Sequence, residues 1–167
     1  AYALGVRLYA VDCKAEVEKV ARVAPGSQVF CRILSDCVGA EWPLSRKFGC
    51  EPTMAADVLE HAHKLGLVAH GISFHVGSQQ NNVHAWDRAL ASAAAVFREC
   101  GERGMNLSMV NLGGGFPTKY LKNVPSVKTY GNAIFKALRK HFGNRIPETI
   151  IEPGRGMVGN AGTIEAE

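Results

Sequence analysis

The residues best suited to chemistry follow apolar stretches of sequence that are typical of buried strands. One such stretch, residues 149–152, ends in Glu152 and is followed by Pro153, Gly154 and Arg155. The guanidinium of Arg155 can bind two phosphate oxygens at once. The carboxylate of Glu152 can pair with a protonated ring nitrogen. A surface ion pair between Glu152 and Arg155 is the alternative interpretation.

A second stretch, residues 109–112, runs directly into Gly113, Gly114 and Gly115. Glycine allows the backbone to approach a ligand closely and to turn several N–H groups towards an anion. Three glycines are equally typical of a flexible turn after a strand. The run therefore supports a phosphate site only together with other residues.

Two more strand-like stretches carry polar side chains. Residues 71–76 include His75, whose imidazole can stack on a planar ring. The stretch is followed by Ser78, whose hydroxyl can bind phosphate. A single histidine in an apolar strand is more often a core residue. Residues 29–34 contain Arg32, and a buried charge of this kind needs an anionic partner. A ligand and a structural carboxylate are both suitable partners.

Together these stretches predict a site for a phosphorylated heteroaromatic cofactor such as pyridoxal 5′-phosphate (PLP). Barrel enzymes place their chemistry at the C-terminal ends of the strands, and the phosphate often lies against the loops after the last two. A sugar-phosphate barrel enzyme is an alternative. It would need the glycine and arginine segments but neither Glu152 nor His75.

The spacing of apolar residues predicts alternating strands and helices. We expect strands over residues 7–12, 29–34, 71–76, 109–112 and 149–152, and helices over residues 14–24, 53–65, 84–103 and 125–142. The third helix has the clearest pattern, with Trp86, Leu90, Ala93, Phe97 and Cys100 on one face. Strands that alternate with helices in this way form a parallel sheet of βαβ units.

The predicted fold class is α/β, and the predicted architecture is a partial (β/α)8 TIM-like barrel. An open doubly wound sheet is the rival, but the GxGxxG sequence typical of its dinucleotide site is absent. A closed barrel needs eight βα units and roughly 250 residues, whereas five units are visible in this chain. We therefore expect a fragment containing the five C-terminal units.

Composition excludes few classes of protein. The chain has 167 residues, is 47% hydrophobic and carries a formal net charge of +4 without a basic run, so nothing supports nucleic-acid binding. Five cysteines without a CxxC pair indicate free thiols in a reducing, cytoplasmic compartment. There is no apolar run of 18 residues and no signal-peptide pattern, so we expect no membrane partner. His61 and His63 lie on different faces of a predicted helix, and we expect no metal site.

Three blocks of sequence carry a family resemblance. GISFHVGSQ (residues 71–79), NLGGGFP (111–117) and IEPGRGMVGNAG (151–162) resemble the fold-type III PLP-dependent decarboxylases of ornithine, lysine, arginine and diaminopimelate. With GGGFP, the segment PLSRKFG (43–49) most resembles the bacterial ornithine decarboxylases. The likeness spans essentially the whole chain, and the blocks occur in the family's order.

The resemblance implies an alanine-racemase-like PLP barrel and assigns roles to residues. His75, stacked on the ring, and Glu152, facing the pyridine nitrogen, become the catalytic residues present in the chain. The implied cofactor-binding residues are Arg32, His75, Ser78, Gly113, Gly114, Gly115, Glu152, Pro153, Gly154 and Arg155. The family's Schiff-base lysine is expected upstream of residue 1. Its cysteine–aspartate pair is expected in a C-terminal β-domain, so residues 1–160 would be barrel and residues 161–167 the start of the connection.

The activity that the resemblance implies is PLP-dependent decarboxylation of L-ornithine to putrescine and CO2 by a homodimer. Lysine or diaminopimelate decarboxylation, or a non-catalytic binding homologue, are the alternatives. Intact cofactor motifs favour an enzyme. We expect no decarboxylase activity from these 167 residues alone, because the lysine and the second half of the site would be absent.

Overall fold

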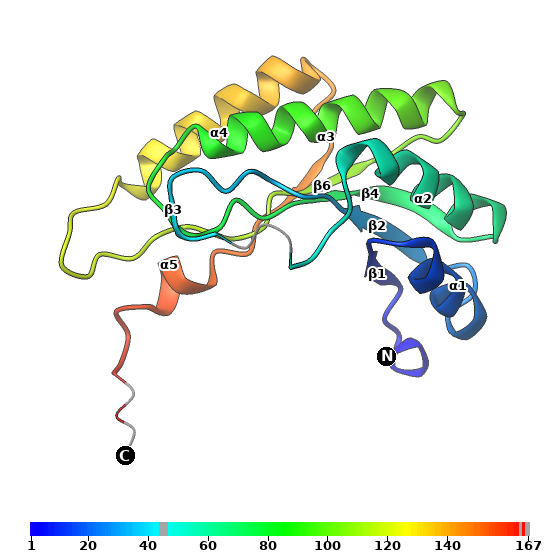
Figure 1. Ribbon diagram of the computed structural model, residues 1–167, viewed down its shortest axis with the longest axis horizontal. Helices are drawn as coiled ribbons and strands as arrows, with labels where there is room; N and C mark the ends of the chain where they lie inside the picture. Colours follow the sequence, from blue (N-terminus) through cyan, green and yellow to red (C-terminus); the bar gives the residue numbers. More distant parts are fainter. Residues whose placement is uncertain (44–46, 164, 166–167) are drawn as a thin grey trace.

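The central element of the computed structural model, which describes residues 1–43, 47–163 and 165, is a five-stranded parallel sheet (Figure 1). Its strands are β1 (Leu8–Val11), β2 (Gln28–Arg32), β4 (Val68–Ser73), β6 (Met109–Asn111) and β7 (Glu148–Ile150). They pair in the order β1-β2-β4-β6-β7, so each strand is added to the same edge. Residues 44–46 of the PLSRKFG segment, and residues 164, 166 and 167 of the expected connection, lie outside the described residues.

Four helices cover one face of this sheet (Figure 1). They are α1 (Lys14–Val23), α2 (Pro52–Lys64), α3 (Ala85–Glu102) and α4 (Val127–Phe142), and each contacts the next. A doubly wound sheet places helices on both faces and reverses its strand order. One-sided helices and a one-way strand order instead form part of a barrel wall, which confirms the predicted fold class.

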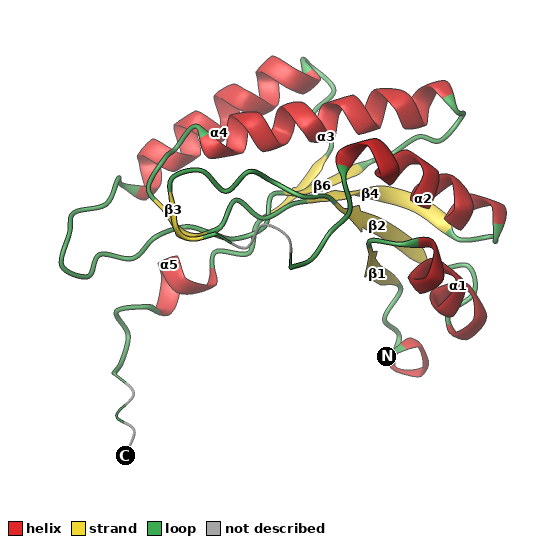
Figure 2. Ribbon diagram, viewed as in Figure 1, coloured by secondary structure: helices red, strands yellow, loops and turns green. Residues whose placement is uncertain are grey.

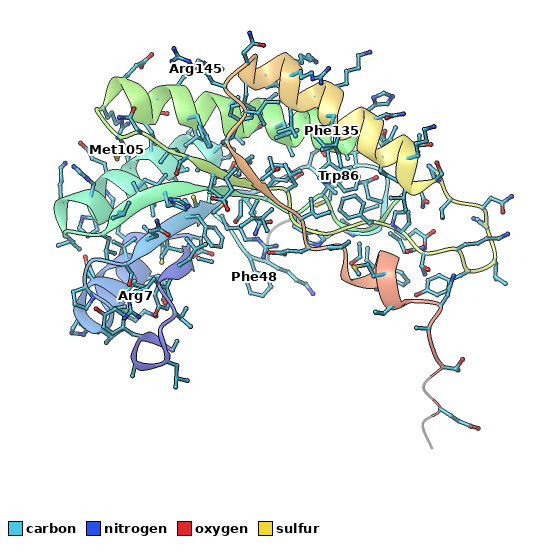
Figure 3. All side chains as sticks on the ribbon, turned by 180° about the vertical axis from the view of Figure 1, so that it is seen from behind. Arg7, Phe48, Trp86, Met105, Phe135 and Arg145 are labelled. Atoms are coloured by element: carbon cyan, nitrogen blue, oxygen red, sulfur yellow. The ribbon has the colours of Figure 1, made fainter. Side chains whose placement is uncertain are left out.

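An aromatic cluster of Trp86, Phe116 and Tyr130 lies between the helices and the loops at the C-terminal end of the sheet. The Trp86 ring centroid is 4.9 Å from that of Phe116 and 5.4 Å from that of Tyr130. The Tyr130 hydroxyl donates a hydrogen bond to the Gln80 carbonyl at 2.7 Å, and burial raises the pKa of this phenol to about 12. Trp86 is the second residue of α3, and its side chain is fully buried (Figure 3). The cluster therefore fixes the segment that follows the three glycines.

Several elements differ from the sequence prediction (Figure 2). Strands β3 (Ala40–Trp42) and β5 (Ser78–Gln80) form an antiparallel pair where no strands were predicted, and a short helix α5 (Gly154–Val158) follows β7. Helix α2 begins at Pro52, with Glu51 as its N-cap, so the predicted start at residue 53 was one residue late. Proline suits this first position because its missing N–H would have no helical partner.

Helix α4 begins at Val127, two residues later than predicted, because Ser126 caps it. The Ser126 hydroxyl accepts a hydrogen bond from the Thr129 backbone N–H at 3.2 Å. The predicted end at Phe142, followed by Gly143, is confirmed. No helix in the described part of the chain is both long enough and apolar enough to span a bilayer.

Candidate cofactor site

A recess of about 100 Å³ lies at the C-terminal ends of the parallel strands. Polar side chains at or just after the ends of four strands line it, because the carboxyl ends of parallel strands all lie at the same end of the sheet. The lining comprises Ala10, Phe30, Arg32, Ser73, Phe74, His75, Asn111 and Glu152. Three residues predicted from separate stretches of sequence, Arg32, His75 and Glu152, are thus brought together.

Glu152 follows β7, and both its backbone and its side chain are hydrogen-bonded. Its backbone N–H donates to the Gly113 carbonyl at 2.9 Å, and its carboxylate Oε1 accepts from the Asn111 side-chain amide at 2.8 Å. Glu152 is otherwise exposed, and no ion pair between it and Arg155 is found within the described ranges. The second carboxylate oxygen therefore remains available to a ligand.

His75 follows β4 and is half-buried beside these charges. Its Nδ1 accepts a hydrogen bond from the Gly77 backbone N–H at 3.0 Å, which places the proton of the neutral ring on Nε2. Burial lowers the pKa of His75, the positive charge of Arg32 lowers it further, and the negative charge of Glu152 opposes both. The ring is therefore neutral near pH 7, as suits a group that stacks on a pyridinium.

The charges around His75 make a prediction about its titration. Arg32→Gln is expected to raise the pKa of His75 and Glu152→Gln to lower it, because each variant removes one of the two opposing charges. NMR titration of the His75 ring in the cofactor-free full-length protein measures both shifts. Shifts of the same sign in the two variants would contradict the placement of His75 between these charges.

The three glycines pack against neighbouring backbone. Gly113 and Gly115 have φ values of 63° and 103°, in the region that favours glycine. A methyl group on Gly113 would overlap the Phe74 carbonyl, and one on Gly115 would lie 2.5 Å from the Gly77 carbonyl. Packing thus accounts for glycine here independently of any ligand, a reason that the sequence did not reveal.

The backbone of this glycine loop still offers donors to an anion. Among the described residues, neither the Gly114 nor the Gly115 N–H donates to an acceptor, whereas the Gly113 N–H donates to Asn111 Oδ1 at 2.9 Å. Gly114 is also buried, and buried backbone N–H groups are rarely left without a partner. Two adjacent N–H groups are therefore suited to phosphate oxygens.

Gly113→Ala is expected to lower the free energy of unfolding of the full-length protein by about 3 kcal/mol, since it combines backbone strain with overpacking. Gly104→Ala is the matched control. Gly104 follows α3 with a φ of 79° and has nothing within 4 Å of an added methyl, so its substitution should cost only about 1 kcal/mol. Equal losses in denaturant unfolding would show that the Phe74 carbonyl does not restrict position 113.

The segment around α5 runs beside the glycine loop. A methyl on Gly114 would lie 2.6 Å from the Glu152 carbonyl and 3.1 Å from His75 Nε2, and one on Gly156 would lie 3.0 Å from Phe116 Cβ. The guanidinium carbon of Arg155 lies 4.9 Å from the centroid of the Trp42 ring. Stacking through the face of a guanidinium leaves its N–H edge free for phosphate.

Arg32 lies at the end of β2, where a structural salt bridge was the alternative to a ligand role. No ion pair to Arg32 is found in the described part of the chain. Its guanidinium carbon instead lies 5.4 Å from the centroid of the Phe48 ring. Phe48 extends from the side of the sheet opposite the helices (Figure 3). The half-buried charge is therefore free to meet an anionic ligand in the recess.

Three residues that support the site have no distinctive spacing in the sequence and were not predicted to belong to it. They are Asn111, Trp42 and the buried Gln79. The side chain of Gln79 exchanges two hydrogen bonds with the Thr118 backbone, at 2.8 and 3.0 Å, and so holds the chain beyond the glycine loop. Gln79 lies in β5 next to Ser78, which starts that strand and is half-buried. No group of three or more potential metal ligands occurs among residues 1–43, 47–163 and 165.

The donors present fit a phosphorylated pyridine. A carboxylate with one free oxygen lies beside a neutral imidazole, and backbone N–H groups without protein acceptors lie in the adjacent loop. Arg32 and Arg155 complete the set, since neither guanidinium pairs with a carboxylate of the described residues. The fold is part of the wall of a (β/α)8 barrel, and its strand ends carry a candidate site for a phosphorylated cofactor.

Comparison with known proteins places this wall in a family. The model of the pyridoxal binding domain of pyridoxal-dependent decarboxylases matches residues 1–159. The chain therefore belongs to that family, and its cofactor is PLP.

Individual relatives show how far the similarity reaches. The lysine/ornithine decarboxylase of Selenomonas ruminantium is 38% identical over 161 residues, covering 93% of this chain and 39% of that protein. The arginine decarboxylase structure from Paramecium bursaria Chlorella virus is 29% identical, with a TM-score of 0.83, and covers 93% and 42%. The structure of SrLDC with PLP and cadaverine is 35% identical, with a TM-score of 0.82, and covers 94% and 39%. The chain spans about two fifths of the length of these relatives.

Proposed function

We propose that the protein decarboxylates a basic amino acid, L-ornithine, to putrescine and CO2. The observation that carries the proposal is the placement of Glu152. Its hydrogen-bonded carboxylate shares a recess with the neutral His75 and with Arg32, beside a glycine loop with two available N–H groups. Membership of a family of pyridoxal-dependent decarboxylases supports the reaction class.

Each residue of the site has one task in this proposal. Glu152 holds a proton on the pyridine nitrogen, and His75 packs on the face of the ring. Arg32 supplies positive charge at the end of β2. Bound PLP supplies the electron sink that lets the substrate's α-carboxylate leave as CO2.

The phosphate end is held by a second set of groups. We assign it to the backbone of Gly113, Gly114 and Gly115, the Ser78 hydroxyl, and the segment Pro153, Gly154 and Arg155. Fixing the phosphate and the ring nitrogen at opposite ends keeps the reacting bond at a constant angle to the ring.

Further assignments follow from the family resemblance. We propose a homodimer in which residues 1–160 are barrel and residues 161–167 begin a connection to a β-domain. A reducing, cytoplasmic location suits five cysteines that are all free thiols. Lysine is the second candidate substrate, since the Selenomonas ruminantium relative is a lysine/ornithine decarboxylase.

Release of CO2 from L-ornithine, L-lysine, L-arginine and diaminopimelate by the PLP-loaded full-length protein tests the proposal. We expect the largest kcat/KM for ornithine. A preference for lysine would make the second candidate the function. Release from none of the four would overturn the proposal and favour a non-catalytic homologue.

A further inference from the structure

Asn111 presents a buried amide at the C-terminal end of β6. Its exposed fraction is 4%, its backbone pairs with Ser73 and Ile150, and its carbonyl accepts a hydrogen bond from the Phe74 N–H at 3.1 Å. An apolar side chain would fill such a position without the cost of burying an amide. The polarity of Asn111 therefore calls for an explanation beyond packing.

The explanation is a closed cycle of three hydrogen bonds. The Gly113 N–H donates to Asn111 Oδ1 at 2.9 Å, and Asn111 Nδ2 donates to Glu152 Oε1 at 2.8 Å. The Glu152 N–H donates to the Gly113 carbonyl at 2.9 Å. Because Oδ1 faces a donor, the amide has only one satisfactory orientation, with its NH2 group towards Glu152.

This cycle restricts a carboxylate that is otherwise free to rotate. Glu152 is exposed, and an exposed glutamate normally samples several rotamers. The backbone and the amide orientation of Asn111 are both fixed. Its hydrogen bond to Glu152 therefore holds Oε1 in one position. That leaves Oε2 for a ligand in the recess, which Asn111 also lines.

We propose that Asn111 is a positioning residue that acts through Glu152, by fixing the carboxylate where it holds the proton on the pyridine nitrogen of PLP. The inference rests on the proposed function. It adds a residue outside the set that the family resemblance assigns.

A double-mutant cycle in the full-length protein tests this role. Asn111→Leu keeps a similar volume and removes the donor, and it is combined with Glu152→Ala. The first measurement is the ¹⁵N chemical shift of ring-labelled PLP bound to each variant, which reports protonation of the ring nitrogen. We expect Asn111→Leu to move this shift towards the unprotonated value, and to move it no further once Glu152 is alanine.

The second measurement is turnover on the same four proteins. Asn111→Leu should lower kcat by about tenfold with Glu152 present, and by less than about twofold when residue 152 is alanine. The PLP dissociation constant should stay within about threefold of the wild-type value, since the Asn111 side chain bonds to neither the Gly114 and Gly115 N–H groups nor Arg155. Asn111→Ala, which introduces no apolar bulk beside Glu152, should give the same pattern if the leucine variant does not fold.

Asn81→Leu is the matched control. Its side-chain amide also donates to a glutamate, Glu41 at 3.4 Å, but it is exposed and outside the recess. Neither measurement should change in that variant. Additive effects of the Asn111 and Glu152 substitutions would overturn the positioning role alone. A wild-type protein that binds no PLP would overturn the proposed function as well.

Discussion

Glu152→Ala in the full-length protein is expected to lower kcat by about 10²–10³-fold while changing the PLP dissociation constant by less than about tenfold. The carboxylate meets only one atom of the cofactor in this account, whereas the phosphate has its own donors. Loss of Glu152 therefore removes an interaction that matters as negative charge flows into the ring. It removes little of the binding energy.

Steady-state kinetics at saturating PLP, together with cofactor titration, measures these two effects separately. Glu148→Ala is the control, because Glu148 is an exposed glutamate at the opposite end of the same strand, β7. It should change neither quantity. Turnover equal to wild type in Glu152→Ala would refute the role of Glu152 at the ring nitrogen.

Arg155→Ala is expected to raise the PLP dissociation constant by about 10–100-fold, since a charge-assisted contact to phosphate is lost. At saturating PLP, kcat should return to within about threefold of wild type because the ring and its partners are unaffected. Arg155→Lys should fall between the two, as an ammonium keeps the charge but neither the planar fork nor the same stacking on Trp42.

Arg145→Ala is the matched control for this experiment. Arg145 is exposed and lies at the end of the molecule opposite α5 (Figure 3). Its loss should leave PLP affinity unchanged. An unchanged dissociation constant in Arg155→Ala, or a kcat that saturating PLP does not restore, would contradict the assignment of Arg155 to the phosphate.

The sequence was sufficient to predict the alternating strands and helices of the parallel sheet. Helix α3 was predicted from the spacing of Trp86 to Cys100, and the structure buries Trp86, Leu90, Ala93 and Cys100. The strands were recognisable because their apolar runs are separated by helices with regular periodicity. Parallel pairing then followed from the alternation, which is why the partial barrel was predictable.

The β3–β5 pair could not be predicted in the same way. Its strands have three residues each, and Ser78–Gln80 is entirely polar. The partners that make these side chains buried lie far away in sequence, such as Thr118 for Gln79 and Val38 for Gln80. Local patterns carry no information about such contacts, so no strand was predicted over residues 78–80.

The sequence was sufficient to predict several residues of the candidate site, but not the hydrogen bonds that they make. Glu152, His75 and Arg32 were expected to meet because all three follow or end strands, and the recess brings them together. Asn111 was overlooked because a single asparagine in a short apolar strand has no distinctive spacing. Its role depends on a hydrogen bond to a residue 41 positions away.

The central claim is that the strand ends bind a phosphorylated pyridine between an acid and a guanidinium. The most direct test is a crystal structure of the full-length protein with PLP. We expect Glu152 Oε2 within hydrogen-bond distance of the ring nitrogen, His75 against the ring face, and the phosphate between the glycine loop and Arg155. A ring nitrogen directed away from Glu152, or a phosphate bound elsewhere, would contradict it.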